Sequence, residues 1–151
     1  MSDLPSRVDI HEEGPREGFQ IEPGPIATAD KIALIEALSA TGLRRIQVAS
    51  FVSPKVVPGW ADAEAVVGGF APRAGVEYTA LWFNAAGLAR ALAFRDRLSV
   101  FGSVTVTASE AFTKRNLNRT QAEQLVAQRA NIAAHREQGV AMERVSVQAA
   151  F

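Results

Sequence analysis

The sequence predicts an α/β domain built on a parallel sheet. Short runs of alternating or continuous apolar residues, typical of strands, are followed in turn by longer stretches whose apolar residues have helical spacing. The order that results is β-α-β-α-β-α-β-α-β. Strands joined by helices lie parallel and are connected by right-handed crossovers. Two architectures share this order, an open doubly wound sheet and part of a (β/α)8 barrel.

The first third of the chain predicts one strand, one long loop and one helix. Residues 7–11 alternate in polarity and predict a strand. Residues 12–27 are rich in glycine and proline and predict a loop. Thr28 is a suitable N-cap for a helix over residues 29–40, and Gly42 stands where a C-cap glycine belongs. Within this range Ile32, Leu34, Ile35 and Leu38 follow helical spacing.

The middle of the chain repeats the pattern. Residues 44–50 predict a strand, in which Ile46 and Val48 alternate with polar side chains. A loop with two prolines follows, and the alanine- and valine-rich residues 61–70 predict a second helix. Residues 76–83 then predict a third strand.

The last third predicts two further strands and two further helices. Residues 85–97 have the apolar spacing of a helix. Residues 103–108, Ser-Val-Thr-Val-Thr-Ala, show the cleanest alternation in the chain and predict a strand. A long helix is expected from Asn118 or Thr120 to about residue 138, ended by Gly139, and residues 143–149 predict a fifth strand.

Length favours a partial barrel. The chain has 151 residues, whereas a complete (β/α)8 barrel needs about 250. No Gly-x-Gly-x-x-Gly follows the first strand, which weakens the dinucleotide-binding alternative. We therefore expect residues 1–151 to form a single, truncated domain with the first five strands and four helices of a TIM-type barrel.

Composition excludes several classes of function. The formal net charge is zero, which argues against a nucleic-acid-binding protein. The chain has no cysteine, so neither a disulfide framework nor a thiolate metal site is expected. The sequence has no long apolar run and no signal-peptide pattern, so we expect no membrane span and a cytoplasmic location.

Polar residues gather where the predicted strands end. In parallel α/β folds, functional loops follow the carboxyl ends of the strands, and residues 12–27, 50–60 and 108–118 all do so. We expect these three loops to converge on one face.

Arg16 and Glu17 are the strongest candidates in the first loop. Arginine can stabilise a developing oxyanion, and a neighbouring carboxylate can bind Mg²⁺ or Mn²⁺. A surface ion pair in a turn explains the same two residues equally well. Strand alternation allows only one of Glu12 and Glu13 to point inward.

Cations in the other two loops are weaker candidates. Lys55 could attract an anionic substrate, and Lys114 with Arg115 could form an anion site at a helix entrance. Solvated lysine and arginine side chains explain these positions at least as well. Histidines His11 and His135 are expected to be packed or exposed rather than catalytic.

The three loops resemble segments of the 3-hydroxy-3-methylglutaryl-CoA lyases, which are metal-dependent TIM-barrel enzymes. Residues 14–20, Gly-Pro-Arg-Glu-Gly-Phe-Gln, look like the family's Gly-Pro-Arg-Asp-Gly-Leu-Gln. Residues 50–58 contain Ser-Phe-Val-Ser-Pro-Lys and then Val-Pro, similar to the lyase branch of this superfamily. Residues 108–116, Ala-Ser-Glu-Ala-Phe-Thr-Lys-Arg-Asn, resemble a third lyase segment.

The resemblance implies a carbon–carbon lyase that cleaves a 3-hydroxyacyl-CoA to a keto product and acetyl-CoA with a divalent metal, Mg²⁺ or Mn²⁺. Arg16 would contact the acyl carbonyl and stabilise the enolate, and Glu17 would bind the metal. The other matched positions are Glu12 and Gln47, as catalytic residues, and Gln20, Ser50 and Lys55, as substrate-binding residues.

Two positions depart from the lyase pattern. Glu17 replaces an aspartate, and Gln47 stands where the lyases carry a functional glutamate. Glutamine can form hydrogen bonds but cannot take up a proton, so we expect altered specificity or activity. The remaining family ligands, a His-x-His pair and an Asn, would follow Phe151. The alternative reading is a catalytically incomplete half-barrel that acts only with a partner or by self-association.

Overall fold

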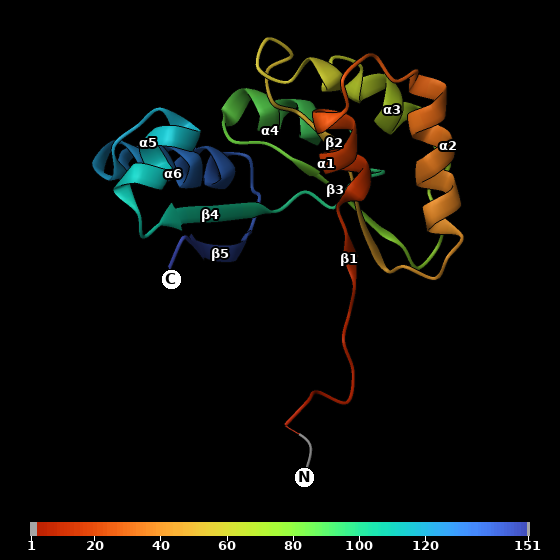
Figure 1. Ribbon diagram of the computed structural model, residues 1–151, viewed down its shortest axis with the longest axis horizontal. Helices are drawn as coiled ribbons and strands as arrows, with labels where there is room; N and C mark the ends of the chain where they lie inside the picture. Colours follow the sequence, from red (N-terminus) through yellow and green to blue (C-terminus); the bar gives the residue numbers. More distant parts are fainter. Residues whose placement is uncertain (1–2, 151) are drawn as a thin grey trace. The chain divides into compact units, whose positions relative to one another are not determined.

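A computed structural model describes residues 3–150, which divide into two compact units (Figure 1). The first unit comprises the chain up to Trp82 together with Ala86–Ser99. The second comprises Phe83–Ala85 and the residues from Val100 onward. Each unit contains a parallel sheet of its own. The expected α/β class with parallel strands is therefore confirmed.

The first unit is built on three parallel strands in the order β1-β2-β3. These are β1 (His11–Glu12), β2 (Arg45–Ser50) and β3 (Glu77–Leu81). The central strand β2 carries the fully buried Ile46 and Val48. The predicted strands at 44–50 and 76–83 are thus confirmed to within a few residues.

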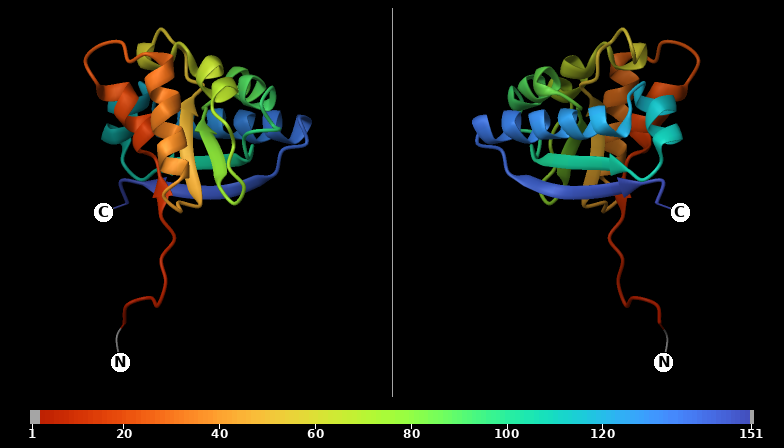
Figure 2. Two further views of the ribbon diagram at one scale, coloured as in Figure 1. Left: turned by 90° about the vertical axis from the view of Figure 1, so that its right-hand side faces the viewer. Right: turned by 90° about the vertical axis from the view of Figure 1, so that its left-hand side faces the viewer.

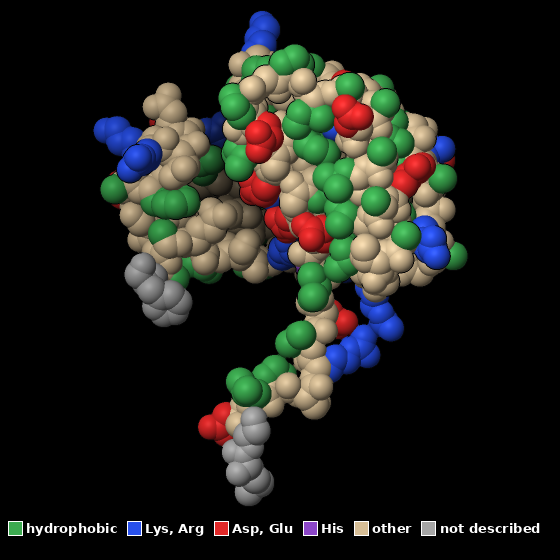
Figure 3. All heavy atoms as spheres, turned by 45° about the vertical axis from the view of Figure 1, so that its right-hand side comes forward, with side chains coloured by type: hydrophobic (Ala, Val, Ile, Leu, Met, Phe, Trp, Pro, Cys, Tyr) green, Lys and Arg blue, Asp and Glu red, His purple; other side chains and the backbone are tan. Residues whose placement is uncertain are grey.

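The first strand is much shorter than the predicted 7–11. Its pairing with β2 begins at His11 opposite Arg45, where β2 itself begins, so the preceding residues have no neighbouring strand in this unit. They extend away from the sheet with apolar side chains open to solvent (Figure 3). The most exposed of these side chains are Leu4, Val8 and Ile10.

Residues 12–27 were predicted to be a loop, but they contain the helix α1 (Gly14–Ile21). Pro15 lies in its first turn, where proline needs no N–H partner and its fixed φ suits a helix. The N–H of Glu17 donates to the carbonyl of Glu13 at 2.9 Å, which closes the first helical turn. The motif Gly-Pro-Arg-Glu-Gly is therefore helical.

Three more helices and a short 3-10 turn complete the first unit. α2 (Thr28–Ser39) and α3 (Ala63–Gly69) pack on β2, α4 (Ala85–Leu92) follows β3, and the 3-10 helix η1 (Pro58–Trp60) contacts α1. Thr28 was expected to cap α2, but Ala27 holds that position, and the Thr28 hydroxyl donates to Asp62 at 2.6 Å. The core of the unit consists mainly of Ile35, Ile46, Val48, Trp60, Val66, Val67, Phe70, Tyr78, Leu88 and Ala91.

The second unit pairs two parallel strands and packs helices beside them (Figure 2). Its strands are β4 (Gly102–Thr107) and β5 (Met142–Gln148), and its helices are α5 (Glu110–Leu117) and α6 (Gln121–Glu137). Thr120 caps α6 in a capping box with Glu123, which confirms Thr120 as the N-cap. The helix α5 was not predicted, because residues 108–118 were taken as a loop.

Side-chain amides of α6 bind the backbone of β4. Gln121, Gln124 and Asn131 donate to the carbonyls of Thr107, Thr105 and Ser103, and the N–H of Thr105 donates to Gln128. Buried backbone groups require partners, and here α6 supplies them along β4. No helix among the described residues is long and apolar enough to cross a membrane.

Candidate active site

The guanidinium of Arg16 is the centre of a polar cluster in the first unit. Its Nε donates to Oε1 of Gln47 on β2 at 2.5 Å. Its Nη2 donates to Oε2 of Glu13 at 2.7 Å, and its Nη1 contacts the carboxylate of Glu17. One charged side chain thus joins both ends of the first helical turn of α1 to the central strand.

Arg16 is buried although it carries a charge. Only 9% of its side chain is exposed, against 43% for Glu13 and 52% for Glu17. Arginine has five N–H donors, and three are used by these partners. The two remaining N–H groups, one on each Nη, have no partner among the described residues.

The backbone of Arg16 is fixed separately from its side chain. The indole Nε1–H of Trp60, a fully buried residue of η1, donates to the carbonyl of Arg16 at 3.0 Å. The rings of Phe19 and Trp60 lie 5.8 Å apart. A Cβ on Gly59 would lie 2.4 Å from the carbonyl oxygen of Phe19, so only glycine allows η1 to approach α1 this closely.

Glu13 is a site residue that sequence reasoning did not select. Strand alternation suggested that one of Glu12 and Glu13 is a solvated charge. In the structure Glu13 is the N-cap residue of α1 and pairs with Arg16, while Oε1 of Glu12 accepts the N–H of Gly14 at 2.5 Å. The spacing of Glu13, Arg16 and Glu17 places them on adjacent helical turns, a signal that becomes visible only once the segment is read as a helix.

Gln47 is held at an irregular point of the sheet. The register of β2 against β3 shifts between Gln47 and Ala49. The side-chain amide oxygen of Gln47 accepts a hydrogen bond from Arg16. A glutamate at this position would offer the same acceptor with a full charge. Gln47 therefore positions Arg16 but supplies neither charge nor a proton acceptor of useful basicity.

The other predicted substrate-binding residues form no hydrogen bond or ion pair with the Arg16 cluster among the described residues. Gln20 is exposed on α1, one turn after Arg16. Ser50 ends β2 and is fully buried, and its Oγ accepts the N–H of Val52 at 3.4 Å. Lys55 is exposed in the following turn and forms no hydrogen bond or ion pair with the described residues. Their roles in substrate binding stay predictions.

The described residues do not by themselves fit a divalent metal. Between residues 3 and 150 no three His, Asp or Glu side chains gather in a way that could hold a metal ion. One oxygen of the proposed ligand Glu17 faces the guanidinium of Arg16, whose positive charge disfavours a cation at the same oxygen. Metal binding by Glu17 stays a prediction that needs ligands beyond these residues.

The third predicted loop belongs to the second unit. Lys114 and Arg115 were expected at a helix entrance, but they lie in the last turn of α5. Cations there complement the negative end of the helix dipole, whereas an anion site needs the opposite end. The expected placement of this pair at a helix entrance is therefore wrong, and the helix dipole gives no support to an anion site there. The N-cap of α5 is Ser109, whose side chain accepts the N–H of Phe112 at 3.2 Å.

The two histidines are not part of the cluster. His135 is buried in α6, with its Nδ1 2.7 Å from the carbonyl oxygen of Asn131. His11 is exposed in β1. The expectation that these histidines are packed or exposed is confirmed, and their lack of a catalytic role stays a prediction.

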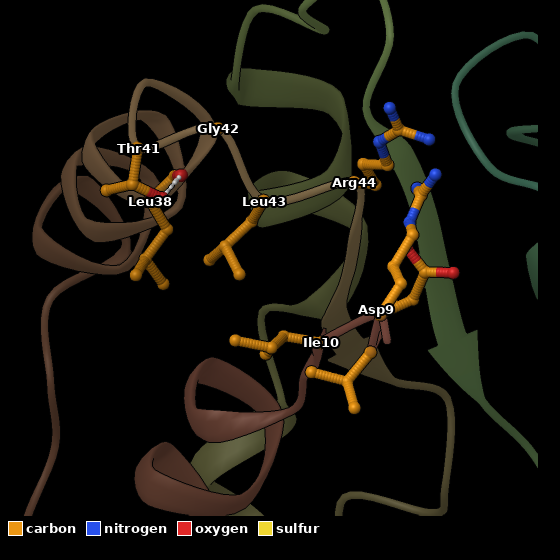
Figure 4. A pocket seen from close by; sticks show the side chains of 9 residues that line it. Asp9, Ile10, Leu38, Thr41, Gly42, Leu43 and Arg44 are labelled. Atoms are coloured by element: carbon orange, nitrogen blue, oxygen red, sulfur yellow. Dashed lines mark hydrogen bonds and ion pairs between the residues drawn. The ribbon is translucent and has the colours of Figure 1, made fainter. Parts of the chain in front are cut away.

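A cavity of about 570 Å³ opens at the opposite end of the strands (Figure 4). It lies between the extended residues 7–10 and the turn from α2 to β2, where Leu38, Leu43 and Ile10 face one another. This turn precedes the first residue of β2, whereas Ser50 is the last residue of β2. The cavity is therefore separate from the Arg16 cluster, which lies toward the carboxyl ends of the strands.

Comparison with known proteins identifies homologues over most of the chain. The sequence is 47% identical over 116 residues to a 3-hydroxy-3-isohexenylglutaryl-CoA/hydroxymethylglutaryl-CoA lyase of Pseudomonas aeruginosa, a match covering 76% of this chain and 37% of the relative. It is 43% identical over 122 residues to a hydroxymethylglutaryl-CoA lyase of Bacillus subtilis, covering 80% and 40%. The chain thus spans less than half the length of these relatives. No protein-family model matches it.

Solved structures give the same result. A hydroxymethylglutaryl-CoA lyase from Pseudomonas aeruginosa matches with a TM-score of 0.82 and 41% identity, over 97% of this chain and 47% of that one. The lyase from Bacillus subtilis matches with a TM-score of 0.81 and 37% identity, over 95% and 47%. A third lyase, from Acinetobacter baumannii, matches with a TM-score of 0.78 and 30% identity and is in complex with coenzyme A and 3-methylmalate. The expected fold, part of a TIM-type barrel, is confirmed.

Proposed function

Because this chain is homologous to hydroxymethylglutaryl-CoA lyases over 76% of its residues, we propose that it supplies the Arg16 side of a carbon–carbon lyase site. The substrate is a 3-hydroxyacyl-CoA of the hydroxymethylglutaryl type, and the products are a keto compound and acetyl-CoA. The observation that carries this proposal is the buried Arg16 guanidinium, held by Gln47, Glu13 and Glu17 with two N–H groups left over.

Arg16 acts by stabilising negative charge. When the carbon–carbon bond breaks, the 3-hydroxyl group loses its proton and becomes the keto group of one product. The electron pair of the broken bond moves onto the other fragment, whose carbonyl oxygen becomes an enolate oxygen until its carbon takes up a proton to give acetyl-CoA. Donors fixed in advance stabilise such an oxygen without reorganising during the reaction. Glu13, Glu17 and Gln47 hold the guanidinium in place, so its two remaining N–H groups keep their direction.

Gln47 and Glu17 adjust this site relative to the lyase pattern. The amide of Gln47 keeps the hydrogen bond to Arg16 but leaves the guanidinium with one fewer negative partner than a glutamate would supply. Less of its charge is then neutralised within the protein. We expect these two changes to alter the activity of the site or the acyl group that it accepts.

The divalent metal remains part of the proposal only for a protein that supplies further ligands. The described residues form no metal centre, so no step is assigned to a metal here. Assembly with another polypeptide or with a second copy would be one source of the missing groups. For location we propose the cytoplasm, since the homologues include a bacterial lyase and a rat lyase described as cytoplasmic.

The alternative is a half-barrel with no activity of its own. It is favoured by the exposed apolar residues Val145 and Val147 on β5, which are 75% and 57% exposed. An apolar strand left open in this way is a surface for pairing with another chain.

One experiment separates the two functions. The isolated chain and a chimera, in which the chain replaces the matching segment of the Pseudomonas aeruginosa lyase, are incubated with 3-hydroxy-3-methylglutaryl-CoA and Mn²⁺, and acetyl-CoA is measured. Acetyl-CoA from the chimera supports the lyase proposal, and its formation by the isolated chain would exclude the inactive half-barrel. A folded chimera that releases no acetyl-CoA from this or the isohexenyl substrate would overturn the lyase proposal.

A further inference from the structure

Lys31 is buried at the junction of α1, α2 and η1. Only 4% of its side chain is exposed, and the chain's two other lysines, Lys55 and Lys114, are exposed. Lysine is almost never fully buried unless it is paired. Water therefore cannot stabilise the charge of Lys31, and its partners in the protein must do so.

The Lys31 ammonium has partners on every side. Nζ donates to the carbonyl of Gly59 at 2.6 Å and to Oδ1 of Asp62 at 2.7 Å. It also lies 5.1 Å from the centre of the Trp60 ring and 5.9 Å from that of Phe19. The second carboxylate oxygen of Asp62 is occupied by the Thr28 hydroxyl at 2.6 Å. The lysine thus binds η1 through the carbonyl of Gly59 and the ring of Trp60, and it binds the N-cap residue of α3 through the carboxylate of Asp62.

These contacts lead directly to Arg16. Lys31 holds Gly59 and Trp60, and Trp60 holds the carbonyl of Arg16 through its indole N–H at 3.0 Å. Gly59 in turn lies against the backbone of Phe19. The turn η1 is the end of the segment that begins at Ser50, so Lys31 also fixes this segment against α1.

We propose that Lys31 is a positioning residue for Arg16. The Lys31 ammonium locks Gly59 and Trp60 against α1, and Trp60 fixes the backbone from which the Arg16 side chain reaches Gln47. This inference rests on the proposed function only in so far as Arg16 contacts substrate. The mechanical link from Lys31 to Arg16 does not depend on it.

Hydrogen exchange in the 151-residue chain, without substrate, tests the link. NMR follows exchange of two protons, the Nε–H of Arg16 and the indole Nε1–H of Trp60, with Trp82→Phe and Arg16→Lys used for assignment. In Lys31→Met both protons should exchange at least about tenfold faster than the change in global unfolding explains. Lys114→Met, which alters an exposed lysine of the second unit, should leave both rates unchanged.

A purely structural lysine predicts a different pattern. Lys31→Met would then lower global stability, and both protons would speed up only in step with it. That result, or unchanged rates in a folded variant, would overturn the proposal.

If Lys31→Met does not fold, Asp62→Asn weakens one contact of Lys31 and keeps the rest. Exchange of the Arg16 Nε–H in Asp62→Asn that is faster than the change in global unfolding explains supports the proposal, and a rate that is unchanged or that rises only in step with global unfolding overturns it.

The proposed function can fail independently. If the chimera makes no acetyl-CoA but Lys31→Met speeds exchange at Arg16, the positioning link stands and the lyase assignment falls. If the chimera is active and exchange at Arg16 is unaffected by Lys31→Met, the lyase assignment stands and the positioning link falls.

Discussion

The Arg16 side chain is both charged and buried, and its three partners explain how the fold tolerates this. Removing one partner of a buried charge is costly, because the remaining charge is left without compensation. Glu13 and Glu17 supply negative charge, and Gln47 supplies a neutral acceptor. The cluster therefore combines one guanidinium with two carboxyl groups and one amide.

Residue types alone could predict part of this cluster. The motif at 14–20 pointed to Arg16 and Glu17, and the segment around Gln47 pointed to its partner on β2. Glu13 could not be chosen over Glu12, because the choice depends on where the strand stops and the helix starts. Lys31 and Trp60 could not be found either, since each acts through contacts between residues far apart in the sequence.

The first prediction concerns the two departures from the lyase pattern. In the chimera, Glu17→Asp combined with Gln47→Glu should raise the kcat/KM for 3-hydroxy-3-methylglutaryl-CoA by at least about tenfold, which corresponds to about 1.4 kcal/mol of transition-state stabilisation. The added carboxylate strengthens the hold on Arg16, and the shorter side chain restores the aspartate of the pattern. Steady-state kinetics measure the effect. No gain would mean that these positions do not set activity toward this substrate.

At the scale of elements, α1 is the clearest difference between expectation and structure. Its glycines and proline suggested a loop, because glycine is a poor helix former. The helix is stabilised instead by tertiary contacts, above all the hydrogen bond from Trp60 to the carbonyl of Arg16. The longer elements were predictable because their apolar spacing is sustained, as in α2 and β2.

A pair of glycines tests how closely α1 and η1 pack. Gly59→Ala should destabilise the chain by about 1–3 kcal/mol, because its Cβ would collide with the backbone of Phe19. Gly18→Ala is the matched change in α1 itself. A Cβ there meets nothing within 4 Å, so the substitution should stabilise the helix by about 0.5–1 kcal/mol.

Urea unfolding measures both variants. If Gly59→Ala were as stable as the unchanged chain, the close approach of η1 to α1 would be incorrect, and with it the path from Trp60 to Arg16.

The carboxyl group of Asp62 makes the junction between α2 and η1 sensitive to acid. Burial raises the pKa of Asp62, but the hydrogen bonds from Lys31 and Thr28 and the Lys31 charge together outweigh it, so this pKa lies below its ordinary value of 3.8. A depressed pKa in the folded state stabilises the fold above the ordinary value. This stabilisation is lost as the pH falls through the folded-state pKa.

We therefore expect the free energy of unfolding to fall as the pH is lowered from about 5 to about 3, and to fall less steeply in Asp62→Asn. Asp30→Asn, which changes an exposed carboxyl group in the first turn of α2, is the control. Urea titrations across this range measure both slopes. Equal slopes for Asp62→Asn and the unchanged chain would contradict the ion pair with Lys31.

At the scale of the whole molecule, the chain covers about half of each solved lyase that it matches. The second unit exposes Val145 and Val147 on β5, and β5 pairs with β4 alone among the described residues. Alternation predicted this strand correctly, but alternation cannot tell which neighbour covers a strand. The sequence alone therefore could not predict which elements pack against β5.

We expect the isolated chain to associate in solution. Size-exclusion chromatography with light scattering should give a mass above 16.2 kDa at micromolar concentration, because apolar strand surface promotes pairing between chains. Val145→Lys together with Val147→Lys should shift the population toward the monomer. A monomer with cooperative unfolding, unchanged by these substitutions, would count against the half-barrel alternative.

The central claim is that Arg16 stabilises the enolate formed when the carbon–carbon bond breaks, and kcat for the chimera with Arg16→Gln tests it most directly. The account predicts a fall of about 10²–10³ in kcat, the range seen when one oxyanion donor is removed, while Arg73→Gln, at an exposed arginine of the same unit, leaves kcat unchanged. A folded Arg16→Gln chimera with the kcat of the unchanged chimera would contradict it.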